Sequence, residues 1–123
     1  MRPNPASQPR TWIGAVVALV MASGCAALAH PTEADARWAA KRTPGMTLAS
    51  LERGRRIYVE RCSGCHHLPL PESQPADHWE KVVDKMAARA HLSEDHRDLV
   101  VAFLASASAR LRDDEHATTA RSE

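Results

Sequence analysis

The sequence has 123 residues, a length that suits a single domain, and only 4% of them are aromatic. Sixteen lysine and arginine residues face 15 acidic ones, which leaves a formal net charge of +1 at pH 7. A balance this even gives no electrostatic reason to expect nucleic acid or an anionic membrane surface as a partner.

Residues 1–25 have the pattern of an export signal. Arg2 and Arg10 provide a positive start, and an uncharged apolar run extends from Trp12 to Ala22. The run is too short for a comfortable membrane span, so the sequence predicts transport across the inner membrane of a bacterium. A single-helix anchor that stays uncleaved is the alternative.

Two cleavage sites compete at the end of this signal. Ala22-Ser23-Gly24-Cys25 is similar to the lipobox of bacterial lipoproteins, although leucine is usual at the position of Ala22. Ala27-Leu28-Ala29 instead satisfies the small-x-small rule of an ordinary signal peptidase. We favour lipidation of Cys25, because it accounts for the third cysteine and leaves no spare thiol in an exported protein. The expected location is periplasmic, with a membrane anchor if Cys25 carries the lipid.

Residues 26–46 are rich in alanine, charged residues and proline, which predicts a flexible tether. A flexible chain of about 20 residues has a root-mean-square span of roughly 25 Å. The alternative is a short helix over 34–42, with Trp38 packed against the domain.

The first firm helix is expected from Leu48 to Glu60, with Thr47 as its N-cap. Gly54 in the interior of this helix costs about 1 kcal/mol relative to alanine, so we expect another helix to approach closely there. The face that leads to the cysteine pair carries residues at i, i+3, i+7 and i+11, namely Leu51, Gly54, Tyr58 and Cys62.

Cys62-Ser63-Gly64-Cys65-His66 has the Cys-x-x-Cys-His spacing that attaches a c-type haem. Each thiol can form a thioether with a haem vinyl group, and His66 can place its imidazole on the iron. The sequence therefore predicts one covalently bound haem c. Cys62 and Cys65 are the expected attachment residues, and His66 is the expected proximal ligand.

Other uses of a cysteine pair fit the surrounding sequence less well. A thioredoxin-like pair requires a strand-helix-strand setting, whereas both flanks of this pair have helical patterns. A zinc site requires four ligands, and no second Cys-x-x-Cys or His-x3-His pair follows in the sequence. A disulfide between Cys62 and Cys65 would close too small a loop to stabilise the chain much.

Residues 68–75 contain three prolines and are expected to form a non-helical loop over the haem edge. The carbonyl of Pro69 or of Pro71 is a candidate to accept the Nδ1 proton of His66. Such a bond would fix the imidazole ring and raise its basicity.

The second helix is expected to begin with Asp77 as N-cap and Glu80 as its capping-box partner. At 100° per residue, His78 and His91 point away from the apolar face, so Met86 is the potential iron ligand of this helix that points with the core. That face has residues at i, i+3, i+4, i+7 and i+11, namely Trp79, Val82, Val83, Met86 and Ala90.

The third helix is expected to begin at Ser93, a good N-cap. Phe103 on its apolar face is well placed to meet Gly54 and Tyr58 of the first helix. Residues 112–123 are polar and charged, and we expect them to form a fraying tail.

The segment Gly54-Arg55-Arg56-Ile57-Tyr58, the haem motif and the late Phe103-Leu104 pair together resemble a class I, cytochrome-c-like domain over residues 47–111. The resemblance implies an all-α fold in which three helices wrap around one covalently bound haem c. In this fold the helix before the motif crosses the C-terminal helix near a glycine and an aromatic residue. Tyr58 and Trp79 are then expected to pack on the haem.

One departure from the usual class I pattern concerns the sixth iron ligand, because no methionine follows Ala87. The segment Trp79 to Met86 is instead similar to a subset of small bacterial cytochromes c with a Trp-x6-Met helix. This likeness implies Met86 as the sixth ligand. The alternatives are that Met86 only fills the core, or that the ligand is Met46, His91 or His96.

The expected function follows from the iron ligands. His66 and Met86 together would leave no open coordination site, so we expect a carrier of single electrons between redox proteins, and not an enzyme. The carrier would be a monomer or part of a redox complex. Two alternatives stay open, namely a five-coordinate haem enzyme or gas sensor, and a dedicated haem subunit of a larger oxidoreductase.

Overall fold

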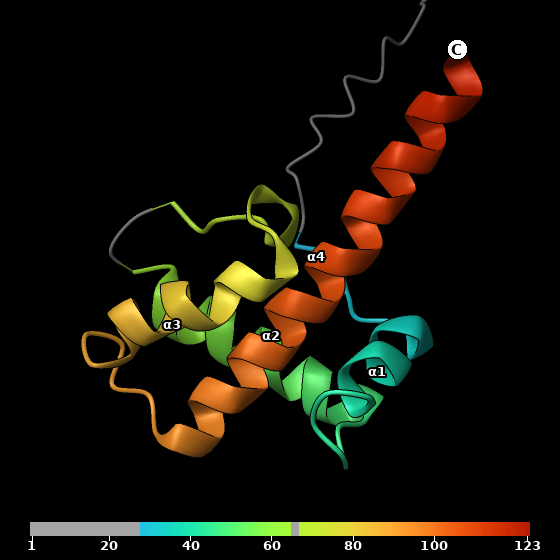
Figure 1. Ribbon diagram of the computed structural model, residues 1–123. Helices are drawn as coiled ribbons and strands as arrows, with labels where there is room; N and C mark the ends of the chain where they lie inside the picture. The colour runs from blue at the N-terminus through green and yellow to red at the C-terminus, as the bar shows by residue number, and fades with distance from the viewer. Residues whose placement is uncertain (1–27, 65–66) are drawn as a thin grey trace, which may run out of the picture.

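The computed structural model describes residues 28–64 and 67–123. Every regular element in these residues is helical, which confirms the all-α prediction. The export signal with Cys25, and the motif residues Cys65 and His66, lie outside the described residues. None of the described helices is long and apolar enough to cross a membrane. In chain order the elements are α1 (Glu33–Ala40), α2 (Leu48–Cys62), the short 3₁₀ helices η1 (Pro71–Ser73) and η2 (Ala76–His78), α3 (Trp79–Ala87) and α4 (Glu94–Ser122) (Figure 1).

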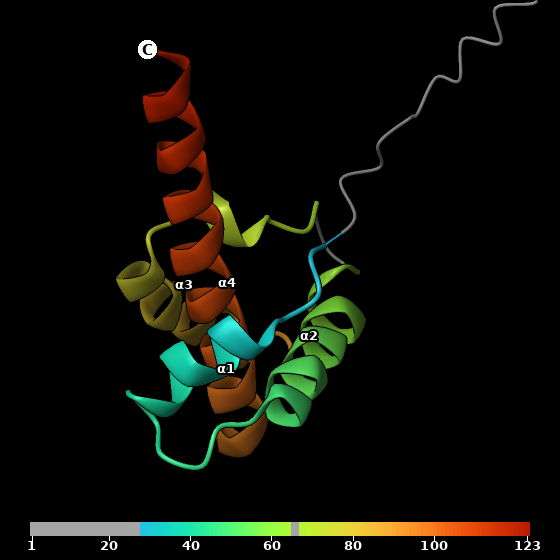
Figure 2. The same cartoon turned by 90° about the vertical axis from the view of Figure 1, so that its right-hand side faces the viewer.

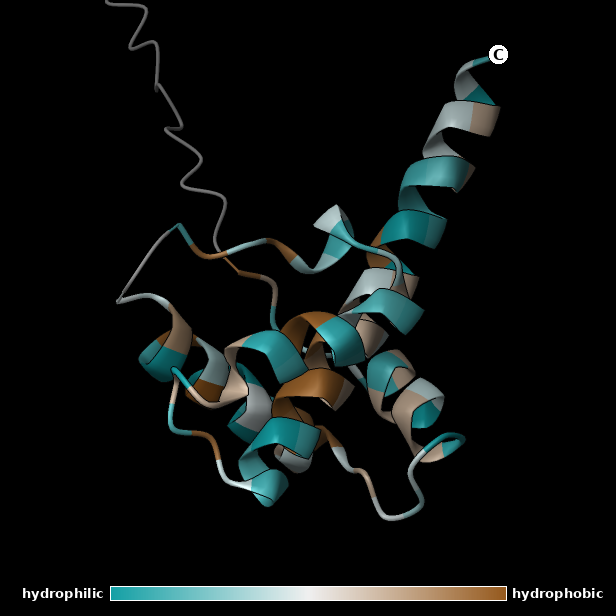
Figure 3. Cartoon of the chain, turned by 60° about the vertical axis from the view of Figure 1, so that its left-hand side comes forward, coloured by the Kyte–Doolittle hydropathy of each residue, from teal (hydrophilic) through white to brown (hydrophobic). Residues whose placement is uncertain are grey.

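Helix α4 runs through the middle of the domain, and its C-terminal end projects beyond the other helices (Figures 1 and 2). As predicted, Ser93 caps it by accepting a hydrogen bond from the amide of His96. Apolar residues gather where α4 passes between the other helices, whereas its projecting end is mostly hydrophilic (Figure 3). Every other helix packs on α4. Its core residues, none of which is exposed, are Val100, Phe103, Leu104 and Ala107.

Helices α2 and α4 cross closely at Gly54, as predicted. A Cβ atom added to Gly54 would overlap the backbone carbonyl of Leu99 and would lie 3.2 Å from the Cβ of Phe103. The rings of Tyr58 and Phe103 pack beside the crossing, with their centroids 6.3 Å apart. A glycine in this helix interior is therefore explained by the close approach of the two backbones.

Residues 28–46 pack against the domain, in contrast to the flexible tether predicted for 26–46. Helix α1 begins with a capping box between Thr32 and Asp35. The Asp35 side chain is completely buried, and its two oxygens share the Nε proton of Arg110 on α4, at 2.9 and 3.0 Å. Helix α1 is thus a fourth helix of the domain, beside the three that were predicted. The ion pair between Asp35 and Arg110 holds it on α4.

The stretch before α1 is also fixed to the domain. Leu28 belongs to the main core, and its carbonyl accepts a 2.9 Å hydrogen bond from Arg55 of α2. The same guanidinium contacts the carbonyl of Ala29 at 3.3 Å. Trp38 packs on the core, and the guanidinium of Arg42 lies 3.5 Å from the centre of its ring. Of the two expectations for this stretch, the structure has the helix with Trp38 against the domain.

Helix α3 begins later than predicted, and Asp77 does not cap it. Asp77 lies in η2, and no side chain caps the first turn of α3. Glu80 binds Arg97 of α4 at 3.0 Å, and the same guanidinium holds Asp84 and Asp98 at 2.7 Å each. These bonds hold the pKa of Asp84 below its ordinary value and that of Arg97 above it. Glu80, which was expected to complete a capping box, thus links α3 to α4.

The expected fraying tail is helical. Helix α4 continues through Ser122, although every residue from Asp113 onward is exposed. Neither glycine nor proline occurs after Pro75, so nothing in the sequence breaks the helix. The hydroxyls of Thr118 and Thr119 add hydrogen bonds to carbonyls four residues earlier.

Candidate haem site

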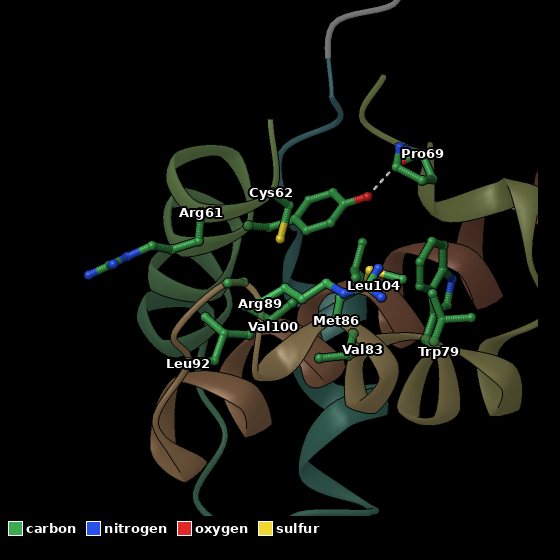
Figure 4. Close-up of a pocket in the computed structure, with 13 residues that line it drawn as sticks. Arg61, Cys62, Pro69, Trp79, Val83, Met86, Arg89, Leu92, Val100 and Leu104 are labelled. Atoms are coloured by element: carbon green, nitrogen blue, oxygen red, sulfur yellow. Dashed lines mark hydrogen bonds between the residues drawn. The ribbon is translucent and has the colours of Figure 1, made fainter. Parts of the chain in front are cut away.

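An apolar cavity, partly open to solvent, lies between the end of α2, helix α3 and the first half of α4 (Figure 4). The lining residues are Tyr58, Arg61, Cys62, Pro69, Trp79, Val82, Val83, Met86, Arg89, Ala90, Leu92, Val100 and Leu104.

Four residues that the sequence analysis assigned to a haem lie together in this lining. Tyr58 and Cys62 come from α2, one helical turn apart, and Trp79 and Met86 come from α3, two turns apart. The sulfur of Cys62 is turned toward the cavity (Figure 4). Helical periodicity therefore identified residues on the two walls of one pocket, although the walls are distant in sequence. Nothing is described for Cys65 and His66, the other two predicted site residues.

Tyr58 and Trp79 each present a ring to the cavity and tie their polar atom to the loop above it. The Tyr58 hydroxyl donates to the carbonyl of Pro69 at 2.6 Å, and Nε1 of Trp79 donates to the carbonyl of Pro71 at 2.8 Å. Because these polar atoms bind the loop, the walls that face the cavity are apolar. The loop of residues 68–75 is thereby held by both α2 and α3.

The two proline carbonyls are the acceptors proposed above for Nδ1 of His66. Each already accepts one hydrogen bond, from Tyr58 or from Trp79. A carbonyl oxygen has two lone pairs, so a second donor is compatible with these bonds. The bond to His66 stays a prediction.

Burial favours the neutral forms of two groups of α2 in this pocket, the Cys62 thiol and the Tyr58 hydroxyl. It raises the pKa of the Cys62 thiol above its ordinary value. Burial, together with the nearby charge of an ionised Cys62, also raises the pKa of Tyr58. Both groups therefore retain their protons at neutral pH. The charged residues of the lining are Arg61 and Arg89.

Sequence reasoning missed these two arginines and Leu92 as pocket residues. Arg61 lies on α2 directly before Cys62, and Arg89 follows the C-cap of α3. Leu92 lies in the turn before α4, next to His91, whose φ of 52° is in the left-handed region. Helical periodicity gives no information about residues in such a turn, so no signal in the sequence marked Arg89 or Leu92.

The rival iron ligands lie elsewhere in the described structure. Met46 packs against a separate cluster that contains Leu51. His96 lies 3.5 Å from the guanidinium of Arg53, and neither it nor His91 contributes to the lining of the pocket.

The lining fits the haem c that the motif implies. The first thiol of the motif opens into a cavity with aliphatic and aromatic walls, and a thioether sulfur lies in the α3 wall. Thioether sulfur paired with imidazole is the usual axial set of cytochromes c. Cys62 and Cys65 would hold the haem covalently, and Tyr58 and Trp79 would pack on it.

An all-helical domain with an apolar pocket beside a Cys-x-x-Cys-His motif defines a cytochrome-c-like haem protein. The model of one family, dihaem cytochrome c, matches residues 58–122, more than half of the chain. The chain belongs to this family. No curated protein and no solved structure gives a match to the chain.

The match includes every residue that lines the pocket, together with the projecting end of α4. It supports haem-based electron transfer. The family name specifies two haems, so the match does not establish the single haem expected from the sequence.

Proposed function

We propose that this protein is an exported one-electron carrier with a single haem c. The observation that carries the proposal is the position of Met86, whose side chain lines the pocket into which Cys62 opens. Cys62 and Cys65 would hold the haem, and His66 and Met86 would ligate its iron. The haem iron supplies the redox chemistry by changing between the ferric and ferrous states.

Two features of the pocket support Met86 as the sixth ligand. It lies on the α3 wall between Val83 and Ala90, which also line the cavity. The rival ligands Met46, His91 and His96 are outside the lining. With both axial positions filled, no site remains for a substrate or a gas, so we propose a carrier and not an enzyme.

The attachment chemistry supports a single haem per chain. The sequence contains one Cys-x-x-Cys-His motif, and its remaining cysteine, Cys25, has no cysteine three positions away. Each haem c in the usual attachment needs its own motif. We therefore propose one haem for this chain, although the family name specifies two.

The first experiment is a visible spectrum of the oxidised holoprotein, examined for the weak long-wavelength charge-transfer band of a methionine bound to ferric iron. We expect the band in the wild type and in Met46→Ala, and its loss in Met86→Ala. Met46 is a suitable control because it packs in a different cluster. A wild-type spectrum that lacks the band would contradict the proposed ligand set.

We also propose that the mature protein is periplasmic, that cleavage occurs before Cys25, and that its partners are other redox proteins. Cleavage after Ala29 would remove Leu28 from the core, and the two carbonyls that Arg55 binds would leave with it. Cleavage before Cys25 retains all of these contacts. The intact mass of the mature protein distinguishes the two sites and reports a lipid on Cys25.

A further inference from the structure

The cavity has two cations in an otherwise neutral, apolar lining. They are Arg61 and Arg89. Within residues 28–64 and 67–123, neither guanidinium has a hydrogen bond or an ion pair. The carboxylates on α3, Glu80 and Asp84, both bind Arg97 instead.

The side chains of the two arginines point in different directions. Arg61 extends away from the cavity, whereas the side chain of Arg89 extends across it, toward Met86 and Leu104 (Figure 4). Arg89 is exposed, but its guanidinium lies along an apolar lining with no anion beside it, so a carboxylate on the ligand of the pocket would give it a partner.

A haem supplies such an anion at a defined place. Its two vinyl groups, which form the thioethers, are on one edge of the ring, and its two propionate carboxylates are on the opposite edge. Arg61 directly precedes Cys62 and therefore belongs to the thioether edge. Arg89 comes from the segment after α3 and is not bound to that edge.

We infer that Arg89 is a positioning residue that forms an ion pair with a haem propionate. The inference rests on the haem of the proposed function, but it does not depend on which residue is the sixth ligand. A guanidinium can donate two parallel hydrogen bonds to a carboxylate. A positive charge held there disfavours the ferric state, so it raises the midpoint potential of the haem.

The test uses the holoprotein and the variants Arg89→Gln, Arg89→Lys and Arg61→Gln. Resonance Raman bending bands of the propionates report their hydrogen bonding directly. We expect these bands to shift in Arg89→Gln, with a fall in midpoint potential. Arg89→Lys is expected to keep most of the potential, because it retains the charge, but to shift the bands, because it cannot bind in the same two-bond geometry.

Arg61→Gln is the matched control, since it removes an equal charge from the same pocket. It is expected to leave the propionate bands unchanged. Unchanged bands in Arg89→Gln, or an equal shift in both glutamine variants, would overturn the inference. The charge-transfer band of the bound methionine, recorded on the same samples, shows separately whether the proposed axial ligands are correct.

Discussion

At the scale of single residues, Tyr58 and Trp79 share one arrangement of ring and polar atom. Each ring forms part of the cavity wall, while its polar atom holds the loop through the carbonyl of Pro69 or Pro71. Neither residue needs a polar partner inside the pocket. A substitution that removes only this polar atom therefore tests the hydrogen bond to the loop without changing the shape of the cavity.

We predict that Tyr58→Phe lowers the free energy of unfolding of the holoprotein by about 1–2 kcal/mol at neutral pH, because the partly buried Pro69 carbonyl loses its donor. Since the folded protein raises the pKa of Tyr58, its contribution is present in full below the ordinary tyrosine pKa of about 10. It decreases as pH rises above that value. The difference between wild type and variant should therefore diminish in strong alkali. Urea unfolding at several pH values measures it.

Ser73→Ala is the control for this prediction. Its hydroxyl donates to the Leu70 carbonyl at 2.6 Å in the same loop, but at an exposed position. We expect a change of less than about 0.5 kcal/mol. Equal losses in the two variants would mean that the Tyr58 bond has no special role in holding the loop.

At the scale of helices, the crossing of α2 and α4 sets the geometry of the pocket, because both helices contribute walls to it. Only the glycine at position 54 lets the two backbones come this close. The crossing also brings Tyr58 against Phe103. A change at Gly54 should therefore alter both stability and the haem environment.

We predict that Gly54→Ala destabilises the holoprotein by about 2 kcal/mol, as the overlap with the Leu99 carbonyl outweighs the better helix propensity of alanine. Thermal and urea unfolding measure the loss. Ala49→Val adds a larger group at an exposed position of the same helix and should cost only about 0.5 kcal/mol. A Gly54→Ala protein more stable than wild type would show that the helices separate without cost.

Patterns within short stretches of the sequence predicted the features that depend on neighbouring residues. The caps Thr47 and Ser93, the crossing at Gly54 and the pocket positions of Tyr58 and Met86 all follow from short-range signals. Each depends on a capping residue or on spacing within one helix. Short-range patterns in the sequence are therefore enough to indicate both main walls of the site.

The features that were missed depend on partners far away in the sequence. Helix α1 is held by Asp35 and Arg110, which are 75 positions apart. Glu80 had the spacing of a capping box with Asp77, but the competing partner Arg97 binds it instead. Neither ion pair produces a periodic pattern in the sequence. Both pairs are therefore recognised only in the folded structure.

At the scale of the whole molecule, a small domain carries an apolar cavity that is partly open to solvent. Tyr58 and Trp79 belong to the core and also line this cavity, so a haem bound there would extend the core. Small domains have little spare stability. A covalently held haem would supply the missing apolar contacts.

We predict that the double variant Cys62→Ala, Cys65→Ala, which cannot attach haem, is largely unfolded. Far-ultraviolet circular dichroism should show the loss of most of the helical signal of the holoprotein. Arg61→Gln, which leaves both thiols in place, serves as the control and should retain that signal. Helical dichroism as strong in the double variant as in wild type would show that the chain folds without its cofactor.

The burial of Leu28 has a consequence for how this protein would meet a partner. If Cys25 carries a lipid, only three residue steps separate the anchor from the core, which is at most about 11 Å of extended chain. The domain would then lie against the bilayer with little freedom to turn. Its search for a partner in the same membrane would be lateral diffusion in two dimensions, and soluble partners would have to approach the membrane surface to exchange electrons with it.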